Sequence, residues 1–205
     1  MSNAIERELV GVRIRLVDLL KSFFQDQPDA QKMETWRGMF SALSQEQISP
    51  LFDTAIRELT TFLQTMSLTD IEKEYHDLFI DPFSAHQVNT MASYYLDGRS
   101  FGTTLVELRG FLADTGLTRV EGVVDSEDSL VMMLDIFARL LEKERQERNE
   151  EIQQQQTHLL TKFLEPFAEQ FSTAMEKNEA AVFYKTICKL LRGYLELEKG
   201  LVTAV

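Results

Sequence analysis

The sequence predicts an all-α protein, and three observations lead to this prediction. Apolar residues recur at helical spacing almost continuously along the 205 residues, and no segment alternates convincingly as a strand would. The chain holds only 9 Gly and 4 Pro. Val and Ile are sparse beside Leu, Phe, Glu and Gln, a balance that favours helix over sheet. With 44% hydrophobic residues the chain can bury a core, so we expect a single-domain helical bundle over residues 1–205.

Four helices are expected in the first part of the chain. The first spans roughly residues 5–24, where apolar side chains follow one face. Pro28 suits the first turn of the second helix, and Ser49-Pro50 supplies a cap and a first-turn proline for the third. Residues 69–72 (TDIE) have the pattern of a capping box and predict the start of the fourth helix.

A long loop is expected between the fourth and fifth helices. It runs from Ile80 to about Thr90 and leads into one or two helical turns near residues 91–96. A loop of this length inside a compact domain is more often a binding segment than a plain connector. A further helix is expected from about Gly102 to Asp114, with Gly116 as its C-cap.

In the last part of the chain the sequence predicts helices that are interrupted at two places, the polar run 142–156 and Pro166. Asp125 or Ser126 is expected to cap the next helix. The polar run 142–156 predicts either a long helix in solvent or the join between two helices. Pro166 should kink or split a helix over residues 157–175, and a final helix spans about 179–197. Hinges within the bundle are most compatible with residues 117–126 or 145–157.

Charge and cysteine content narrow the class of partner. The net charge of −12 and the pI of about 4.7 repel nucleic acid and anionic membranes, and they attract basic peptides. Solubility alone explains the charge equally well. The single Cys188 excludes an internal disulfide, and no apolar run is long enough for stable membrane insertion. We expect a cytoplasmic protein, because the first twenty residues are too charged for a secretory signal.

The motif search gives little chemistry. The three histidines, at positions 76, 86 and 158, match no zinc spacing, and no phosphate-binding glycine motif is present. Cys188 lies on an apolar helix face, as a buried inert thiol would. The carboxylates Asp125, Glu127 and Asp128 suit a helix start better than an acid–base pair. We therefore expect no metal, no cofactor and no enzymatic activity.

Aromatic residues gather on both sides of the long loop. Tyr75, Leu78 and Phe79 end the fourth helix, and Pro82 and Phe83 begin the loop. Tyr94 and Tyr95 close it. Aromatic side chains bury much area at low entropic cost and keep a polar tip, which suits peptide capture. Taken singly, Leu78, Phe79 and Tyr94 fit a core better than a groove. The aromatic density of the whole segment makes a peptide-binding groove as compatible as a core.

The same stretch resembles a known family. Tyr75-x-x-Leu78-Phe79, a proline and Ala92-Ser93-Tyr94-Tyr95 resemble the signature of the TorD/DmsD/NarJ chaperones, which mature molybdenum-cofactor redox enzymes. Residues 98–117, Glu127-Asp128 and the C-terminal helices extend the resemblance to about residues 72–198. The chain departs from the family pattern at Asn89-Thr90-Met91, where many members have proline, and at Ser129, where many have histidine.

The resemblance implies a TorD-like helical bundle and a role without catalysis. Such a chaperone binds the twin-arginine signal peptide of its client and also contacts the catalytic subunit of the molybdoenzyme, so that export waits for cofactor insertion. On this hypothesis the aromatic residues beside the long loop form an apolar groove, and the three carboxylates offer the charge that meets the arginines of the peptide. The residues of this peptide-binding site are Tyr75, Leu78, Phe79, Pro82, Tyr94, Tyr95, Asp125, Glu127 and Asp128.

Two other readings remain open at this stage. A helical adaptor or assembly factor would bind a folded partner without recognising a signal peptide. The second alternative is an enzyme or a nucleotide-binding switch. No phosphate-binding motif is visible for a switch, and the search for catalytic residues is empty for an enzyme. The family also forms dimers, some by exchange of helices, so the resemblance leaves both a monomer and a homodimer open.

Overall fold

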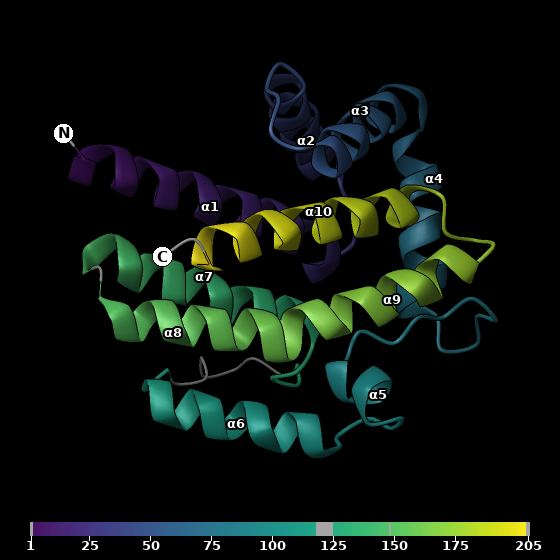
Figure 1. Cartoon of the computed structure of the whole chain (residues 1–205). Coiled ribbons are helices and arrows are strands. Elements are labelled where there is room, and N and C mark those ends of the chain that lie inside the picture. Colours follow the sequence, from purple (N-terminus) through teal and green to yellow (C-terminus); the bar gives the residue numbers. More distant parts are fainter. Residues whose placement is uncertain (1, 118–124, 148, 204–205) are drawn as a thin grey trace. The chain divides into compact units, whose positions relative to one another are not determined.

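The structure is a computed structural model that describes residues 2–117, 125–147 and 149–203. Regular secondary structure in these residues is helical throughout, apart from an isolated antiparallel bridge between Met91 and Ser129 (Figure 1). The all-α prediction is therefore confirmed. Among the described residues, no helix combines the length and the apolar character needed to cross a membrane.

The chain divides into two compact units. Unit 1 comprises residues 1–21, 90–167 and 198–205, and unit 2 comprises residues 22–89 and 168–197. The single domain and its hinges stay predictions. Residues 118–124 of the first predicted hinge and residue 148 of the second lie outside the described residues.

The helices follow one another along the chain with short connections, except for residues 81–91 before α5 and residues 116–129 before α7. They are α1 (Ser2–Gln25), α2 (Ala30–Leu43), α3 (Pro50–Thr65), α4 (Leu68–Tyr75), the π-helical turn η1 (His76–Ile80), α5 (Ala92–Leu96), α6 (Thr103–Thr115), α7 (Leu130–Gln146), α8 (Glu150–Leu159), the π-helical turn η2 (Leu160–Leu164), α9 (Glu165–Lys177) and α10 (Phe183–Thr203). The expected short helix, the loop before it and the left-handed C-cap Gly116 are all present.

Helix starts in the first part follow side-chain caps. Ser49 caps α3 and Pro50 opens it, as predicted. Pro28 lies before the cap of α2, however, because Asp29 accepts the N–H of Lys32 at 2.7 Å. The capping box of α4 consists of Ser67 and Asp70, two residues before the predicted one. Asp29 and Ser67 each accept the backbone N–H three residues ahead, and Asp70 accepts the N–H of Ser67 in return.

The second part also differs from the prediction at its helix starts. Ser129, not Asp125 or Ser126, caps α7, and the acidic residues lie in the turn before it. The polar run 142–156 connects two helices and is not one continuous helix, because α7 ends at Gln146 and Asn149 caps α8. The chain between α9 and α10 continues to residue 182, so the last helix begins later than expected.

Pro166 is accommodated without splitting the helical run. The π-helical turn η2 directly precedes α9, and the N–H of Glu165 bonds to the carbonyl of Leu160. A proline has no N–H to donate and its ring crowds the preceding turn. A single π turn is a known way to absorb such a local mismatch.

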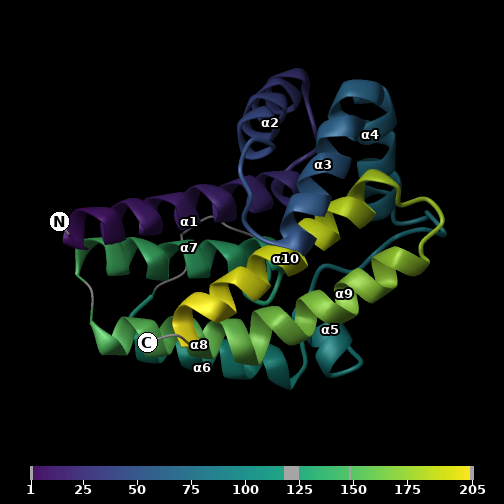
Figure 2. The same cartoon turned by 45° about the horizontal axis from the view of Figure 1, so that its top comes forward.

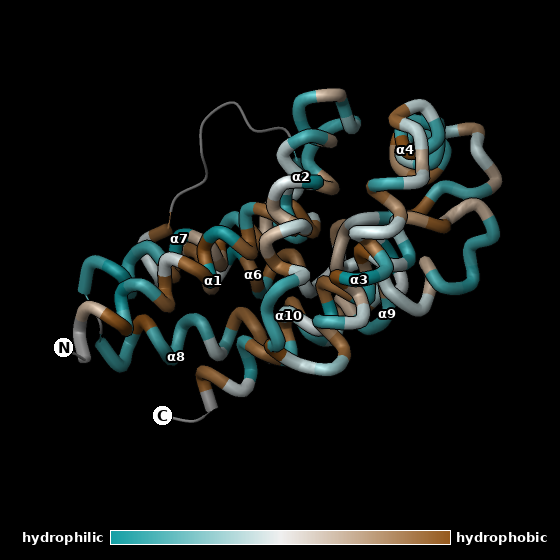
Figure 3. The backbone as a smooth tube through the Cα atoms, turned by 90° about the horizontal axis from the view of Figure 1, so that it is seen from above, coloured by the Kyte–Doolittle hydropathy of each residue, from teal (hydrophilic) through white to brown (hydrophobic). Residues whose placement is uncertain are grey.

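Each unit packs the apolar faces of its own helices. In unit 1, α7 and α8 run side by side (Figures 1 and 2). In unit 2, α2 and α3 pack together, and Phe23, Trp36 and Phe183 form an aromatic core with ring centroids 4.4 to 6.2 Å apart. Apolar and polar residues alternate in bands along the helices, the pattern of amphipathic helices (Figure 3).

Candidate functional site

Tyr75 belongs to the core of unit 2. Its hydroxyl donates to the carbonyl of Phe24 at 3.3 Å, and the hydroxyl of Tyr184 donates to the carbonyl of Phe23 at 3.1 Å. These carbonyls end α1, where helical carbonyls lack partners within their own helix. Burial raises the pKa of the Tyr184 phenol well above its usual range, with Tyr75 and Glu74 adding to the effect. Both tyrosines therefore serve to fix the end of α1.

Glu74 is a buried residue that the sequence reasoning missed. Its carboxylate accepts the N–H groups of Val182, Phe183 and Tyr184 at 2.8 to 3.0 Å. Burial raises the pKa of this carboxyl, while the three N–H donors act in the opposite direction. The side chain thus caps α10 from another helix. Its position three residues after Ile71 on the apolar face of α4 was the available signal.

Leu78 and Phe79 also lie inside unit 2. Leu78 is fully buried, and its carbonyl accepts the N–H of Val88 at 2.8 Å. The ring of Phe79 contacts those of Phe24, Tyr75 and Tyr184, with centroids 5.1 to 5.9 Å apart. Tyr75, Leu78 and Phe79 thus lie together, as predicted. They belong to the core beneath the loop, and Leu78 holds the loop through its bond to Val88.

The loop after η1 carries the exposed apolar residues of this region. The backbone N–H of Phe83 donates to Asp81 Oδ1 at 2.9 Å, which forms a tight Asx turn. Phe83 is 94% exposed, and Pro82 beside it is exposed as well. The carbonyl of His86 accepts a hydrogen bond from Asn178, so the far side of the loop is fixed to its own unit.

In unit 1, Asp128 organises the start of α5. Its Oδ2 accepts the N–H of Ser93 at 2.8 Å, and its Oδ1 accepts the hydroxyl of Ser126. Its carbonyl accepts the N–H of Ala92, and the carbonyl of Thr90 accepts the N–H of Leu130. Asp128 is fully buried. Its charge is therefore used inside unit 1.

Two exposed aromatic residues lie close to this start. Tyr94, on α5, is 46% exposed, and Phe101 is 66% exposed. The N–H of Phe101 donates to Ser93 Oγ at 2.9 Å. Because Ser93 directly precedes Tyr94, this bond ties the backbone of Phe101 to the start of α5. Tyr95 packs edge-on against Tyr94 and Phe167. Phe101 is not among the predicted site residues, although an aromatic residue within a polar glycine turn was a usable signal.

The turn that carries Phe101 is tightly constrained. Phe101 has a φ of 60°, which is uncommon for a residue other than glycine. Asp97 accepts the N–H and the hydroxyl of Thr104 at 2.8 and 2.9 Å. A Cβ at Gly102 would come within 2.3 Å of that carboxylate, so only glycine fits there. Strain of this kind persists where surrounding contacts enforce it, often at binding sites.

The other two predicted acidic residues differ in exposure. Glu127 is buried and forms an ion pair with Arg109 of α6 at 2.9 Å. Asp125 is exposed. Of the three predicted acidic residues, Asp125 is thus the one whose side chain faces solvent.

The side chains considered for chemistry are consistent with support roles. No group of three His, Cys, Asp or Glu side chains in the described parts of the chain is placed to hold a metal ion. Cys188 is buried, and burial raises the pKa of its thiol. His158 stacks on Phe111 of α6 with centroids 5.3 Å apart.

Comparisons with known proteins agree with the fold. The family model described as nitrate reductase delta subunit matches residues 45–173. A crystal structure of a candidate redox enzyme maturation protein from Archaeoglobus fulgidus aligns with a TM-score of 0.58 at 17% sequence identity. The alignment covers 90% of this chain and 93% of that one, which shows a shared fold. Comparison with curated proteins gives no match.

Proposed function

Since the chain belongs to the nitrate reductase delta subunit family of redox-enzyme maturation chaperones, we propose that it binds the twin-arginine signal peptide of a molybdenum-cofactor oxidoreductase. The same chaperone would contact the apo catalytic subunit in the cytoplasm, where cofactor insertion precedes export. The proposal rests on the family and on one feature of unit 1, the exposed aromatic residues Tyr94 and Phe101.

These two aromatic residues suit an apolar peptide segment. They expose large rings on a turn that is already ordered, so binding costs little conformational entropy. Exposed aromatic residues held in one geometry are typical anchors of peptide recognition. The apolar stretch of a leader would cover Tyr94 and Phe101 and remove their rings from water.

On this proposal some predicted site residues contact the peptide and others position those that do. Tyr94 contacts the peptide, and Tyr95 orients Tyr94 through its ring contact. Tyr75, Leu78 and Phe79 act from the core of unit 2 and shape the loop that carries Pro82. Asp128 and Glu127 position the start of α5 and the turn before α7, while Asp125 offers its charge to the arginines of the leader.

Titration calorimetry of the full chain against a synthetic twin-arginine leader tests this proposal. We expect low-micromolar binding, about −8 kcal/mol. A twin-lysine leader should bind more weakly, because lysine lacks the bidentate geometry of arginine. Phe101→Ala and Tyr94→Ala should each weaken binding about tenfold without lowering the melting temperature.

Ile48→Ala serves as the matched control, because Ile48 is an exposed apolar residue outside the proposed site. This variant should bind the leader as the wild type does. Equal losses in the control and in Phe101→Ala would count against the aromatic site. Absence of binding across a panel of leaders would count against signal-peptide recognition as a whole.

An adaptor function is the second candidate, and the loop of unit 2 is the observation that favours it. Phe83 is almost fully exposed on a fixed Asx turn, next to the half-exposed Ile80. Such a presentation suits contact with a folded catalytic subunit. Binding of a purified mature enzyme without its leader, lost in Phe83→Ala, would support this function.

Light scattering at two protein concentrations would decide between a monomer and a dimer.

A further inference from the structure

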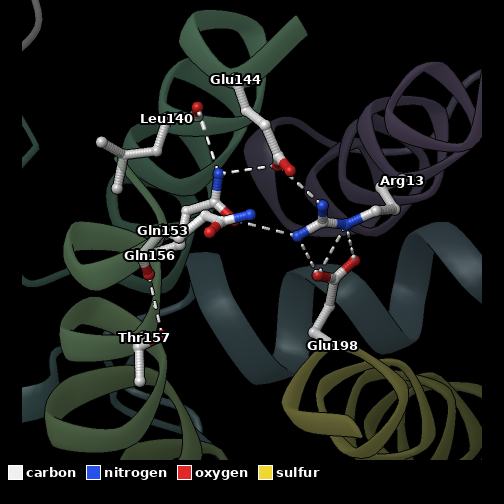
Figure 4. A network of polar contacts seen from close by, with 7 residues as sticks. All are labelled: Arg13, Leu140, Glu144, Gln153, Gln156, Thr157 and Glu198. Carbon is white, nitrogen blue, oxygen red and sulfur yellow. Dashed lines mark hydrogen bonds and ion pairs between the residues drawn. The ribbon is translucent and has the colours of Figure 1, made fainter. Parts of the chain in front are cut away.

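A buried polar network of other residues lies inside unit 1. Arg13 of α1 donates to Glu144 of α7 at 2.8 Å and to Gln156 of α8 at 3.1 Å. It also donates to both oxygens of Glu198 of α10 at 2.7 to 3.1 Å (Figure 4). Gln156 in turn donates to Glu144 and to the carbonyl of Leu140. The four side chains of this Arg13 network are each at least nine-tenths buried.

The charges in the Arg13 network do not balance. One guanidinium faces two carboxylates, so the network carries a net charge of about −1 when all three groups are ionised. Both oxygens of Glu198 accept hydrogen bonds from Arg13. Glu144 uses Oε2 for both Arg13 and Gln156, and its Oε1 accepts no hydrogen bond from the described residues. Ser172 Oγ is the only fully enclosed side-chain polar atom without a hydrogen-bond partner in the described residues, so Glu144 Oε1 keeps some contact with solvent. A donor can therefore reach this oxygen from outside the Arg13 network.

A cavity of about 440 Å³ opens beside this carboxylate. Arg13, Glu144 and Gln156 form its buried polar side, and the other polar residues of the lining are Glu6, Arg7, Arg145, Gln146 and Gln153. Its apolar wall consists of Leu9, Val10, Leu201 and Val202. Leu9 is 46% exposed and Leu201 is 39% exposed, so the wall reaches the surface. The volume lies within the range of small-ligand pockets, which combine an apolar lining with a few fixed polar groups.

The other charged residues at the cavity donate no hydrogen bond to Glu144 Oε1 among the described contacts. Arg145 lines it but is paired with Glu142 at 2.6 Å, outside the Arg13 network. Arg7 and Glu6 line it as well, so the lining holds three arginines and two glutamates in all. The excess negative charge of the buried part therefore stays with Glu144 and Glu198.

We propose that this cavity binds an organic cation, a guanidinium or ammonium group on a short carbon chain. The cationic head would donate to Glu144 Oε1 and balance the charge of the Arg13 network. The carbon chain would lie along the apolar wall, as the stems of arginine and lysine do on apolar surfaces. This site does not depend on leader binding at Tyr94 and Phe101. The cation can come from an arginine side chain of a bound polypeptide or from a free small molecule.

Neutral isosteres make a sharp test. Ligand-observed NMR and calorimetry of the full chain would compare n-butylguanidinium with n-butylurea, and acetyl-Leu-Arg-Leu-amide with its citrulline counterpart. Urea and citrulline keep the shape and remove the charge. We expect each cation to bind at millimolar concentrations or better, about −4 kcal/mol. Each neutral isostere should bind about tenfold more weakly.

Variants locate the binding. Glu144→Gln keeps an oxygen for the network and should weaken cation binding about tenfold. Glu107→Gln is the matched control, since Glu107 is a carboxylate of α6 paired with Lys162, and it should change nothing. If Glu144→Gln does not fold, Leu9→Ala at the exposed wall should still weaken both cations a few-fold, because it removes apolar contact.

The two arms separate the sources of the cation. Tighter binding of the arginine tripeptide supports a polypeptide side chain, and tighter binding of n-butylguanidinium supports a free small cation. Equal affinity for a cation and its neutral isostere overturns the proposal. So does binding that Glu144→Gln and Leu9→Ala leave unchanged, or no binding of either cation.

Discussion

Replacing Glu74 should destabilise unit 2 in a graded way, because one carboxylate holds three backbone N–H groups at the start of α10. In Glu74→Gln the amide oxygen can keep the two bonds that Oε1 accepts. The amide NH₂ then faces the N–H of Phe183, and one buried donor without an acceptor costs about 1–3 kcal/mol. Glu74→Ala removes the acceptor for all three donors. We expect a loss of about 3 kcal/mol or more in the free energy of unfolding, because each buried donor left without an acceptor costs about 1–3 kcal/mol.

Urea unfolding followed by two probes measures this loss. Trp36 is the single tryptophan and belongs to the core of unit 2, where its indole N–H donates to Ser22 Oγ at 2.9 Å. Its fluorescence therefore reports on the unit that contains Glu74, while far-UV circular dichroism reports on all helices. If the two curves of a variant separate, unit 2 unfolds before the rest and each transition is fitted separately.

Glu72→Gln is the matched control for this series. Glu72 lies on the same helix, two residues away, and is only partly buried. Its replacement should change the free energy of unfolding by no more than about 0.5 kcal/mol. A Glu74→Ala variant as stable as Glu72→Gln would refute the assignment of Glu74 as the cap of α10.

The pH dependence gives an independent check on Glu74. The pKa of this carboxyl is raised above its ordinary value of 4.5, mainly by burial. A carboxyl with a raised folded-state pKa contributes stability that is full below the unfolded-state pKa and is lost as the pH rises through the folded-state pKa. The wild type should therefore gain stability relative to Glu74→Gln as the pH falls from 7 to about 4. A difference that shrinks on acidification would mean that the three N–H donors outweigh burial.

Three further predictions concern unit 1 and the thiol. Gly102→Ala should cost about 1–3 kcal/mol, because its Cβ would displace Asp97 from the N–H and hydroxyl of Thr104; thermal unfolding measures the loss, and an unchanged midpoint would contradict it. Cys188 should react with a thiol reagent only under denaturing conditions, because it is buried and burial raises its pKa; rapid labelling of the native chain would show otherwise. Asp128→Asn should lower stability by about 1–3 kcal/mol in the same unfolding assay, since both oxygens of this buried carboxylate accept hydrogen bonds; a stable variant would place that aspartate outside the core.

The helical pattern could be predicted from the sequence because it depends on neighbours. Apolar spacing and short-range caps act over three to four residues, so Ser49, Pro50 and Gly116 are in the roles assigned to them. The errors are of the same local kind. Asp29 caps α2 one residue after the proline that was expected inside its first turn. Ser67 caps α4 two residues before Thr69, because both hydroxyls can accept a backbone N–H at a helix start.

The buried polar contacts could not be predicted in this way. Glu74 meets the N–H of Tyr184 at a separation of 110 residues, and Arg13 meets Glu198 at a separation of 185. No local rule pairs residues so far apart, and an acidic residue on a helix face looks solvated until its partner is known. Phe101 was missed for a related reason, since its exposure depends on the turn around Gly102 and Asp97.

These contacts change how the acidic sequence should be read. A net charge of −12 suggests a surface ready for a basic peptide, yet Glu74, Glu127 and Asp128 each hold a partner inside their own unit. An exposed carboxylate acts on an approaching cation over a range of about 8 Å at physiological salt. On the proposed function, recognition of a charged leader would depend on the position of exposed carboxylates such as Asp125. Among the buried ones, Asp128 would contribute through the geometry that it imposes on Ser93, whose hydroxyl oxygen accepts the N–H of Phe101.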